Sequence, residues 1–217
     1  MGVLQGFLDL LFPRKCVFCG GLLHGEETDL CSACRASAPV FTGPAKTLRF
    51  VQGWTAAYFY EAEVRASLLR FKFHGRRSYA AAYGRFLAAR IQQTFAGGYD
   101  VLTYVPVSRR RRWSRGYDQV RLLAEATARE LGQRPVRTLR KVRHSPAQST
   151  QGGADSRRAN VLGAYAPVKR AEVTGKRVLL LDDILTTGAT VSECAKVLQL
   201  AGAEEILCAA LAARRGQ

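Results

Sequence analysis

Two adjacent aspartates followed by three threonines are the residues of this chain best suited to chemistry. The apolar run Val178 to Leu181 leads to Asp182 and Asp183, and Thr186-Thr187-Gly188-Ala189-Thr190 follows at the start of a helical pattern. Backbone N–H groups and hydroxyls at a helix N-terminus bind a phosphate monoester, and Gly188 allows the backbone to approach it closely. The carboxylates suit sugar hydroxyls, or a Mg²⁺ ion shared by those hydroxyls and a pyrophosphate. Together these groups describe a site for 5-phosphoribosyl-1-pyrophosphate (PRPP), with Asp182 and Asp183 as candidate catalytic residues.

Four cysteines form a second chemical group, with the spacing Cys16-x2-Cys19-x11-Cys31-x2-Cys34. Each Cys-x2-Cys motif offers two thiolates, and the four thiolates together can bind one metal ion tetrahedrally. The spacing therefore predicts structural zinc. The segment is short and rich in glycine, and we expect it to gain its folding energy from the metal, separately from the rest of the chain. Two disulfides or a redox pair are the alternatives, which a reducing cytosol and the doubled spacing disfavour.

Three further residues near or outside this spacing need an interpretation. His24 is expected to face solvent rather than the metal. Cys194 and Cys208 lie in a helical and a strand pattern, and they are expected to be small buried hydrophobic residues.

Positive charge is concentrated in one region of the chain. The formal net charge is +16, and the segment from Tyr104 to Arg158 has 14 Lys and Arg against 4 Asp and Glu. Such an excess favours polyanionic partners. The run Arg109-Arg110-Arg111-Arg112-Trp113 suits single-stranded nucleic acid, because cations meet phosphates and aromatic rings stack on bases. A solvated basic loop is the alternative.

Strand and helix patterns alternate through most of the chain and predict a mostly parallel α/β sheet. Ligands bind beyond the carboxyl ends of such strands, which here lead into the loops 108–119 and 182–190. The predicted strands are Trp54 to Tyr60, Val101 to Val107, Arg177 to Leu181 and Glu205 to Ala212. The predicted helices are Ala62 to Phe71, Ala80 to Phe95, Asp118 to Leu131 and Ala189 to Leu200.

The apolar N-terminus is expected to pack on the protein rather than to target it. Leu4, Phe7, Leu8 and Leu11 have the spacing of an amphipathic helix, and no convincing signal peptide precedes the cysteines. No stretch approaches the roughly 18 apolar residues of a membrane span, so a cytoplasmic protein is expected. We expect two domains, with the amphipathic helix and the four-cysteine zinc ribbon at 1–46 and the α/β domain that carries the PRPP site at 47–217.

The 13 residues from Val178 to Thr190 match, at every position, the PRPP-binding signature of type I phosphoribosyltransferases. This resemblance implies that the loop after the first core strand holds pyrophosphate, which assigns Arg115 and Gly116 to that ligand. It also implies a mobile loop that closes over PRPP and excludes water. The segment from Arg140 to Arg158 is in the right place, with Arg143 and Gln148 as its candidate contacts.

The order of motifs along nearly the whole chain resembles the ComF family. These motifs are the double Cys-x2-Cys ribbon, Leu69-x2-Lys72-x2-Gly75, Val105-Pro106-Val107, Arg115-Gly116-Tyr117-Asp118-Gln119, Gln148, Arg157-x2-Asn160 and the PRPP loop. The resemblance implies a role in natural competence, through handling of single-stranded DNA, with helicase or recombination factors as partners. It also implies Mg²⁺-dependent displacement of pyrophosphate from PRPP by a nitrogen nucleophile. The alternative is a nucleotide-metabolism enzyme with a small nitrogen acceptor and no DNA binding.

Overall fold

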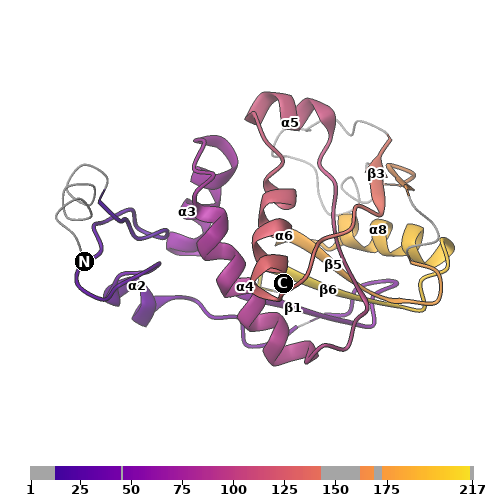
Figure 1. Ribbon diagram of the computed structural model, residues 1–217, viewed down its shortest axis with the longest axis horizontal. Coiled ribbons are helices and arrows are strands. Elements are labelled where there is room, and N and C mark those ends of the chain that lie inside the picture. Colours follow the sequence, from indigo (N-terminus) through magenta and orange to yellow (C-terminus); the bar gives the residue numbers. More distant parts are fainter. Residues whose placement is uncertain (1–12, 45, 143–161, 169–172, 216–217) are drawn as a thin grey trace.

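The computed structural model describes residues 13–44, 46–142, 162–168 and 173–215 (Figure 1). The expected N-terminal amphipathic helix lies outside these ranges. So do Arg143, Gln148, Arg157 and Asn160 of the expected mobile loop.

A parallel four-stranded sheet with the order β1-β6-β5-β2 forms the centre of the fold. Its strands are β1 (Gly53–Phe59), β2 (Val101–Tyr104), β5 (Arg177–Leu185) and β6 (Glu205–Ala213). A short antiparallel pair, β3 (Leu139–Lys141) and β4 (Tyr165–Pro167), lies apart from this sheet. The helices are α2 (Ser32–Ser37), α3 (Ala62–Phe73), α4 (Tyr79–Phe95), α5 (Arg109–Arg115), α6 (Gln119–Glu130) and α8 (Ala189–Leu200).

Both faces of the sheet are covered, as is expected when helices connect parallel strands. Helices α3, α4 and α6 lie on one side and α8 on the other (Figure 1). Side chains of β5 alternate between the two layers, because successive residues of a strand point to opposite faces. Leu179 and Leu181 join the hydrophobic core under α3, α4 and α6, whereas Val178 and Leu180 join the core under α8.

Helix α2 and strands β3 and β4 were not predicted, and the strand expected to reach Val107 ends at Tyr104. Two further differences matter for the site. The strand predicted to end at Leu181 continues to Leu185, because Asp182, Ile184 and Leu185 pair with β6. The aspartates therefore lie within the strand and not after it.

The second difference is the segment after β2, which was expected to be a loop and contains helix α5. Ser108 caps this helix by accepting a hydrogen bond from the Arg111 N–H, and Gly116 ends it with φ 73°. Arginine is a good helix former, so capped ends suffice to order the run.

The first Cys-x2-Cys turn packs into the core of the α/β domain. Phe18 is 2% exposed and meets the ring of Tyr58 edge to face at 5.1 Å. On α3, the Ser67 hydroxyl and the Arg70 guanidinium donate hydrogen bonds to the carbonyls of Val17 and Phe18, respectively. The expectation that the ribbon and the α/β domain have separate sources of stability is therefore wrong for this turn.

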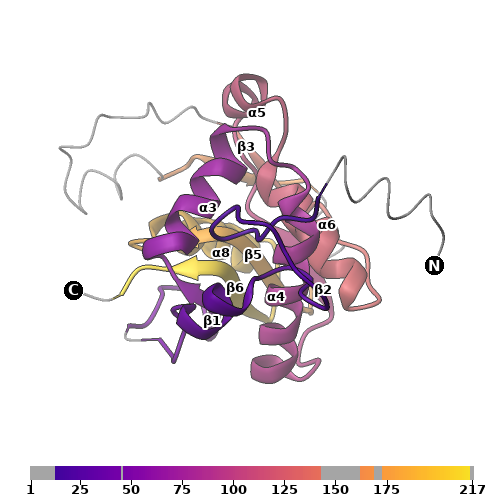
Figure 2. The ribbon, with the colours of Figure 1, turned by 90° about the vertical axis from the view of Figure 1, so that its left-hand side faces the viewer.

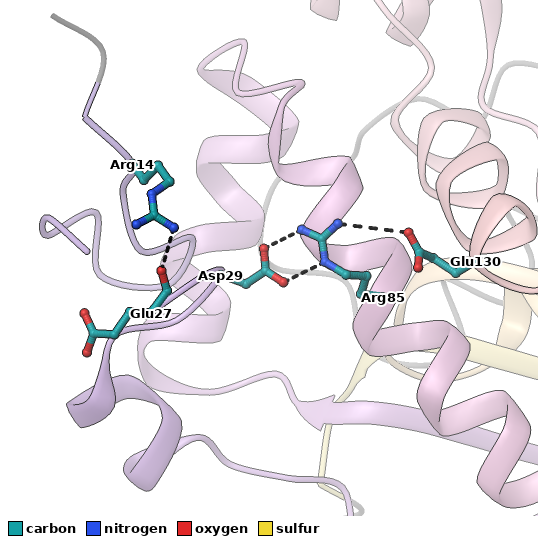
Figure 3. A network of polar contacts seen from close by, with 5 residues as sticks. All are labelled: Arg14, Glu27, Asp29, Arg85 and Glu130. Atoms are coloured by element: carbon teal, nitrogen blue, oxygen red, sulfur yellow. Dashed lines mark hydrogen bonds and ion pairs between the residues drawn. The ribbon is translucent and has the colours of Figure 1, made fainter. Parts of the chain in front are cut away.

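Charged groups join the ribbon to α4 as well (Figure 3). The Asp29 carboxylate accepts hydrogen bonds from Arg85 Nε at 2.8 Å and from Arg85 Nη2 at 2.5 Å. The same guanidinium lies 4.0 Å from Glu130 of α6. Within the ribbon, Arg14 Nη1 donates to the Glu27 carbonyl at 2.9 Å. Figure 2 views the molecule from the side of the zinc ribbon, which lies in front of α3 and α4.

None of the helices in the described part of the chain has the length and hydrophobicity that crossing a membrane would require.

Replacing Phe18 with Ala should destabilise the whole chain and not only the ribbon. The ring is buried, so we expect a loss of about 3–5 kcal/mol in the free energy of unfolding, measured by chemical denaturation with circular dichroism. Leu22→Ala is the matched control within the ribbon, because Leu22 is 50% exposed and should cost about 0.5 kcal/mol or less. Equal small losses for both variants would show that Phe18 is not part of the shared core.

Candidate functional site

Asp182 and Asp183 lie near the carboxyl edge of the sheet, beside the end of β2. Tyr104 is paired with Leu181, and the Val105 N–H donates to the Leu181 carbonyl at 2.9 Å. The segment that leads to α5 therefore starts next to the aspartates. Because carboxyl ends of parallel strands meet at one edge, the two loops expected to carry chemistry lie side by side.

The Asp183 carboxylate joins three elements that are far apart in the sequence. Lys72 Nζ of α3 donates to Asp183 Oδ1 at 2.8 Å, and Gln119 Nε2 at the start of α6 donates to Oδ2 at 3.1 Å. The lysine and aspartate side chains are 16% and 7% exposed. A buried carboxylate needs such partners, because an unpaired charge away from water is costly.

Asp182 has a different environment from its neighbour. Its Oδ1 accepts a hydrogen bond from the Asp183 N–H at 2.8 Å. Burial, followed by the charge of Asp183, raises the pKa of Asp182 to about 8. The carboxyl therefore holds a proton at neutral pH in the free protein. A cation or a hydroxyl donor that arrives at this site would favour its ionised form.

The turn from β5 into α8 gathers hydroxyl and backbone groups around a small hollow. Thr187 Oγ1 accepts a hydrogen bond from the Ala189 N–H at 3.4 Å, and Lys46 Nζ donates to the Thr186 carbonyl at 2.7 Å. The loop encloses a small hollow of about 30 Å³, lined by Asp182 and by residues 184–191 that include Thr190. The first turn of α8 thus presents N–H groups next to the aspartates.

Gly188 has two physical reasons to be glycine in this loop. Its φ is 78°, in the left-handed region, and a Cβ there would overlap the side chain of Leu48. From the sequence, Gly188 was expected to permit close approach of a phosphate. In the structure, the segment before β1 occupies the space where its Cβ would be.

Arg115 packs against α3 from the end of α5. Its guanidinium lies 4.8 Å from the ring centre of Phe73. Burial lowers the pKa of Arg115, and the negative charge of Asp183 acts in the opposite direction. The Gly116 N–H, by contrast, donates to the Trp113 carbonyl at 3.3 Å, and Arg77 Nη2 donates to the Gly116 carbonyl at 2.8 Å. The structure therefore packs the Arg115 side chain against Phe73, the residue after Lys72, while the backbone of Gly116 has partners of its own.

Helix α5 distributes the run of arginines over different faces. Arg109 and Arg112, three residues apart, line a groove of about 420 Å³ with residues of α6 and β3. Arg111 is close enough to Lys141 of β3 to repel its charge. Trp113 is 86% exposed. The run of four arginines suggested one continuous basic surface. The helix instead brings only Arg109 and Arg112 into this groove.

The four ribbon cysteines are arranged as a zinc site requires. Their Sγ atoms all lie within 4.8 Å of one another, and none is in a disulfide. The Gly21 N–H donates to Cys19 Sγ at 3.3 Å and the Cys34 N–H donates to Cys31 Sγ at 3.5 Å, as expected for sulfur ligands with negative charge. His24 is exposed and does not belong to the cluster. The residues present fit one tetrahedral Zn²⁺ ion.

Two residues of the site, Lys72 and Gln119, were not predicted from the sequence. Both belong to the motifs that carry the resemblance to the ComF family. Lys72 is a cation between two aromatic residues, Phe71 and Phe73, near the end of α3. A cation between apolar residues could have indicated a buried carboxylate partner. Gln119 is a polar residue in the first turn of α6 and is only 3% exposed. Its Oε1 atom is buried with no hydrogen-bond partner within the described residues. The distance in sequence from both residues to Asp183 explains why neither role was predicted.

A cavity of about 660 Å³ lies beside the loop and not over the aspartates. Residues of the segment before β1, Leu162, and the outer face of α8 line it. It shares Thr187 and Ala189 with the loop. This cavity therefore adjoins the aspartates and does not enclose them.

Two family comparisons match different parts of the chain. Residues 121–217 match the phosphoribosyl transferase domain, and residues 7–45 match the double zinc ribbon domain. The first range contains β5, α8 and the aspartates, and the second contains all four clustered cysteines.

Curated relatives match over most of the chain. Competence protein F of Haemophilus influenzae is 27% identical over 218 residues, which cover 90% of this chain and 95% of that protein. Competence protein ComFC of Bacillus subtilis is 27% identical over 66% of this chain and 56% of that protein. DNA utilization protein YhgH of Escherichia coli K12 is 30% identical over 62% of this chain and 60% of that protein. The chain thus spans less than two thirds of the latter two.

Solved structures that the chain matches in part include a glutamine PRPP amidotransferase from Bacillus subtilis complexed with ADP and GMP. It is 24% identical with a TM-score of 0.45, over 66% of this chain and 30% of that chain. A phosphoribosylpyrophosphate synthetase from Mycobacterium smegmatis is 21% identical with a TM-score of 0.37, over 59% of this chain and 33% of that chain.

We predict that the reduced protein contains one zinc ion per chain, measured by elemental analysis. Replacing Cys31 with Ser should lower the zinc content to background, because three thiolates leave the tetrahedron open. Cys208→Ser is the control, since Cys208 lies in β6 and outside the cluster, and it should retain the metal. Zinc-free wild-type protein, prepared reduced and without chelators, would rule out the site.

Asp182→Asn should stabilise the free protein at alkaline pH. The folded chain binds the Asp182 proton more tightly than the unfolded chain, so its contribution to stability falls as the pH rises from 3.8 toward about 8. Asn keeps the acceptor for the Asp183 N–H and removes this cost. At about pH 9 we expect a gain of at least about 1 kcal/mol, or about 2–4 °C in Tm, which shrinks toward about pH 5.

Asp100→Asn is the contrasting variant for this test. Pairing with Arg177 lowers the pKa of Asp100 to about 2, so its ionised form is stabilised and its removal should not raise the Tm. Identical Tm changes for both variants across this pH range would contradict the assignment of a raised pKa to Asp182.

Proposed function

Because the chain belongs to the ComF family and combines a zinc ribbon with a type I phosphoribosyltransferase fold, we propose that it binds PRPP with Mg²⁺ and handles single-stranded DNA during DNA uptake. The observation that carries the PRPP part is the juxtaposition of Asp182 and Asp183 with a phosphate-type loop at one edge of the sheet. Relatives named for competence and DNA utilization support the DNA part.

We expect PRPP to bind at the site in a single orientation. Its 5-phosphate suits the N–H groups and hydroxyls of residues 186–190, and its ribose hydroxyls suit Asp182 and Asp183. The pyrophosphate then extends toward Lys72 and Arg115, the two cations near Asp183. Arg143 and Gln148 remain candidates for a covering loop.

The aspartates fit a magnesium ion, because carboxylate oxygens are its preferred protein ligands. Mg²⁺ supplies neutralisation of the charge that develops on a leaving pyrophosphate. The protein's own residues would orient the ribose and hold the pyrophosphate. A nitrogen nucleophile then displaces the pyrophosphate at C1, and positioning and electrostatics contribute most of the rate.

The acceptor can be a small nitrogen compound or a nucleic acid. The cavity of about 660 Å³ beside Thr187 and Ala189 has the volume of a small-molecule site, and this favours the small acceptor as a second candidate. A screen of bases, amines and single-stranded DNA for PRPP-dependent release of pyrophosphate distinguishes the two. Release with DNA alone supports the first function, and release only with a small amine or base supports the second.

Single-stranded DNA would bind along the exposed side of α5. Arg109 to Arg112 are exposed, and Trp113 offers an aromatic surface to bases. In both orientations of the ribbon diagram, α5 projects beyond the rest of the described fold (Figures 1 and 2). The free cysteines and a phosphorylated metabolite as ligand support action in the cytoplasm. We place the boundary between ribbon and transferase-like domain after Lys46.

Changing both Asp182 and Asp183 to Asn should weaken binding of PRPP with Mg²⁺ by at least about tenfold, or about 1.4 kcal/mol, in calorimetry. The reason is the loss of charged acceptors for the ribose hydroxyls and the metal. The matched control replaces the exposed residues Glu26 and Glu204 with Gln, which removes the same charge elsewhere. Equal affinity in wild type and the Asp182/Asp183 variant, with an intact fold, would refute the PRPP site.

Changing Arg109, Arg110, Arg111 and Arg112 to Gln should make DNA binding less dependent on salt. Each phosphate neutralised contributes about −0.7 to the slope of log affinity against log salt for single strands, so the slope should become about 2–3 units shallower. PRPP affinity should fall much less, because the loop after β5 is unchanged.

Trp113→Ala separates stacking from charge in the same assay. It should cost about 1–3 kcal/mol with little change in slope, because stacking releases no counterions. Wild-type protein without salt-sensitive DNA binding at low ionic strength would refute the DNA part of the proposal and leave the PRPP part standing.

A further inference from the structure

We propose that the groove between α5, α6 and β3 binds the sugar–phosphate backbone of single-stranded DNA. This inference rests on the proposed handling of DNA. It assigns the DNA phosphates to a groove that combines two arginines of α5 with cations of other elements. The groove has a volume of about 420 Å³. Six cations line it: Arg109, Arg112, Arg121, Arg137, Arg140 and Lys141.

The groove has little negative charge of its own. Asp118 lines it, but this carboxylate caps α6 and accepts a hydrogen bond from the Arg121 N–H at 3.0 Å. The Arg121 guanidinium pairs with Glu125 at 2.8 Å. Among the residues that the structure describes, no carboxylate lies within ion-pair distance of the other five cations. Unneutralised like charges in one hollow repel one another, and a polyanion would relieve this repulsion.

Lys141 shows the effect of this crowding most directly. Its ammonium group lies 5.1 Å from the ring centre of Tyr165. Burial lowers the pKa of Lys141, and the charge of Arg111 lowers it further, while Asp182 acts in the opposite direction. Tyr104 also lines the groove and pairs with Leu181, the residue before Asp182, so a backbone lying in the groove would lead to the rim of the PRPP site.

The distribution of the cations favours a chain of phosphates over a single phosphate group. Arg109 and Arg112 come from α5, Arg121 from α6, and Arg137, Arg140 and Lys141 from β3 and the segment before it. Cations on three separate elements follow an extended charge, whereas one anion is held by converging groups. Trp113 follows Arg112 in α5, is 86% exposed, and would stack with a base of a single strand.

The test replaces both Arg137 and Arg140 with Gln, since neither belongs to the PRPP site or to α5. Both side chains are exposed, so the fold should be retained with an unchanged Tm. The control replaces Arg65 and Arg129, exposed arginines of α3 and α6 outside the groove, with Gln. A fluorescein-labelled oligothymidylate is titrated in anisotropy across a salt series. Relative to the control, the groove variant should bind at least about tenfold more weakly with a slope about 1.4 units shallower.

Each other outcome identifies a different failure. Wild-type protein that binds no DNA refutes the DNA part of the proposed function and the groove with it. DNA binding by the groove variant that equals the control overturns the groove but leaves α5 as the interface. A groove variant that loses affinity for inorganic pyrophosphate in calorimetry, and none for DNA, shows a pyrophosphate site only and overturns the proposal.

Discussion

The buried ion pair between Lys72 and Asp183 is the contact on which the arrangement of this protein depends. It connects α3, from the first third of the chain, to β5, and Gln119 brings the start of α6 to the same carboxylate. Taking these charges out of water costs free energy that mutual attraction repays only with good geometry. Packing alone would not require such a pair, whereas a site for a phosphorylated sugar requires a charged carboxylate held in a fixed position.

The zinc ribbon belongs to the same arrangement, through the helix that carries Lys72. Ser67 and Arg70 of α3 hold the carbonyls of the first cysteine turn, and Phe18 fills the core beside that helix. The metal thus orders a turn that packs on α3, and α3 positions a cation at the site. This continuity gives a physical reason for the ribbon and the transferase-like fold to occur in one chain.

Local patterns predicted the elements well, and contacts between distant residues were harder to foresee. The strands, helices, cysteine cluster and cap at Asp118 follow from signals within a few residues of each other. The extension of β5 to Leu185 depends on its pairing with β6, which overrides the polar character of two aspartates. Lys141 and Gln119 gain their environment only when the chain folds. The division of the arginines over faces of α5 needed a helix where the run of charges suggested a loop.

The most direct measurement is a crystal structure of the protein with Mg²⁺ and PRPP bound. We predict that the 5-phosphate lies within hydrogen-bond distance of the backbone of residues 186–190, with the ribose hydroxyls facing Asp182 and Asp183. The pyrophosphate should lie on the side of Lys72 and Arg115. Density for PRPP only along α5 or in the neighbouring basic groove, with the loop after β5 empty, would contradict this assignment.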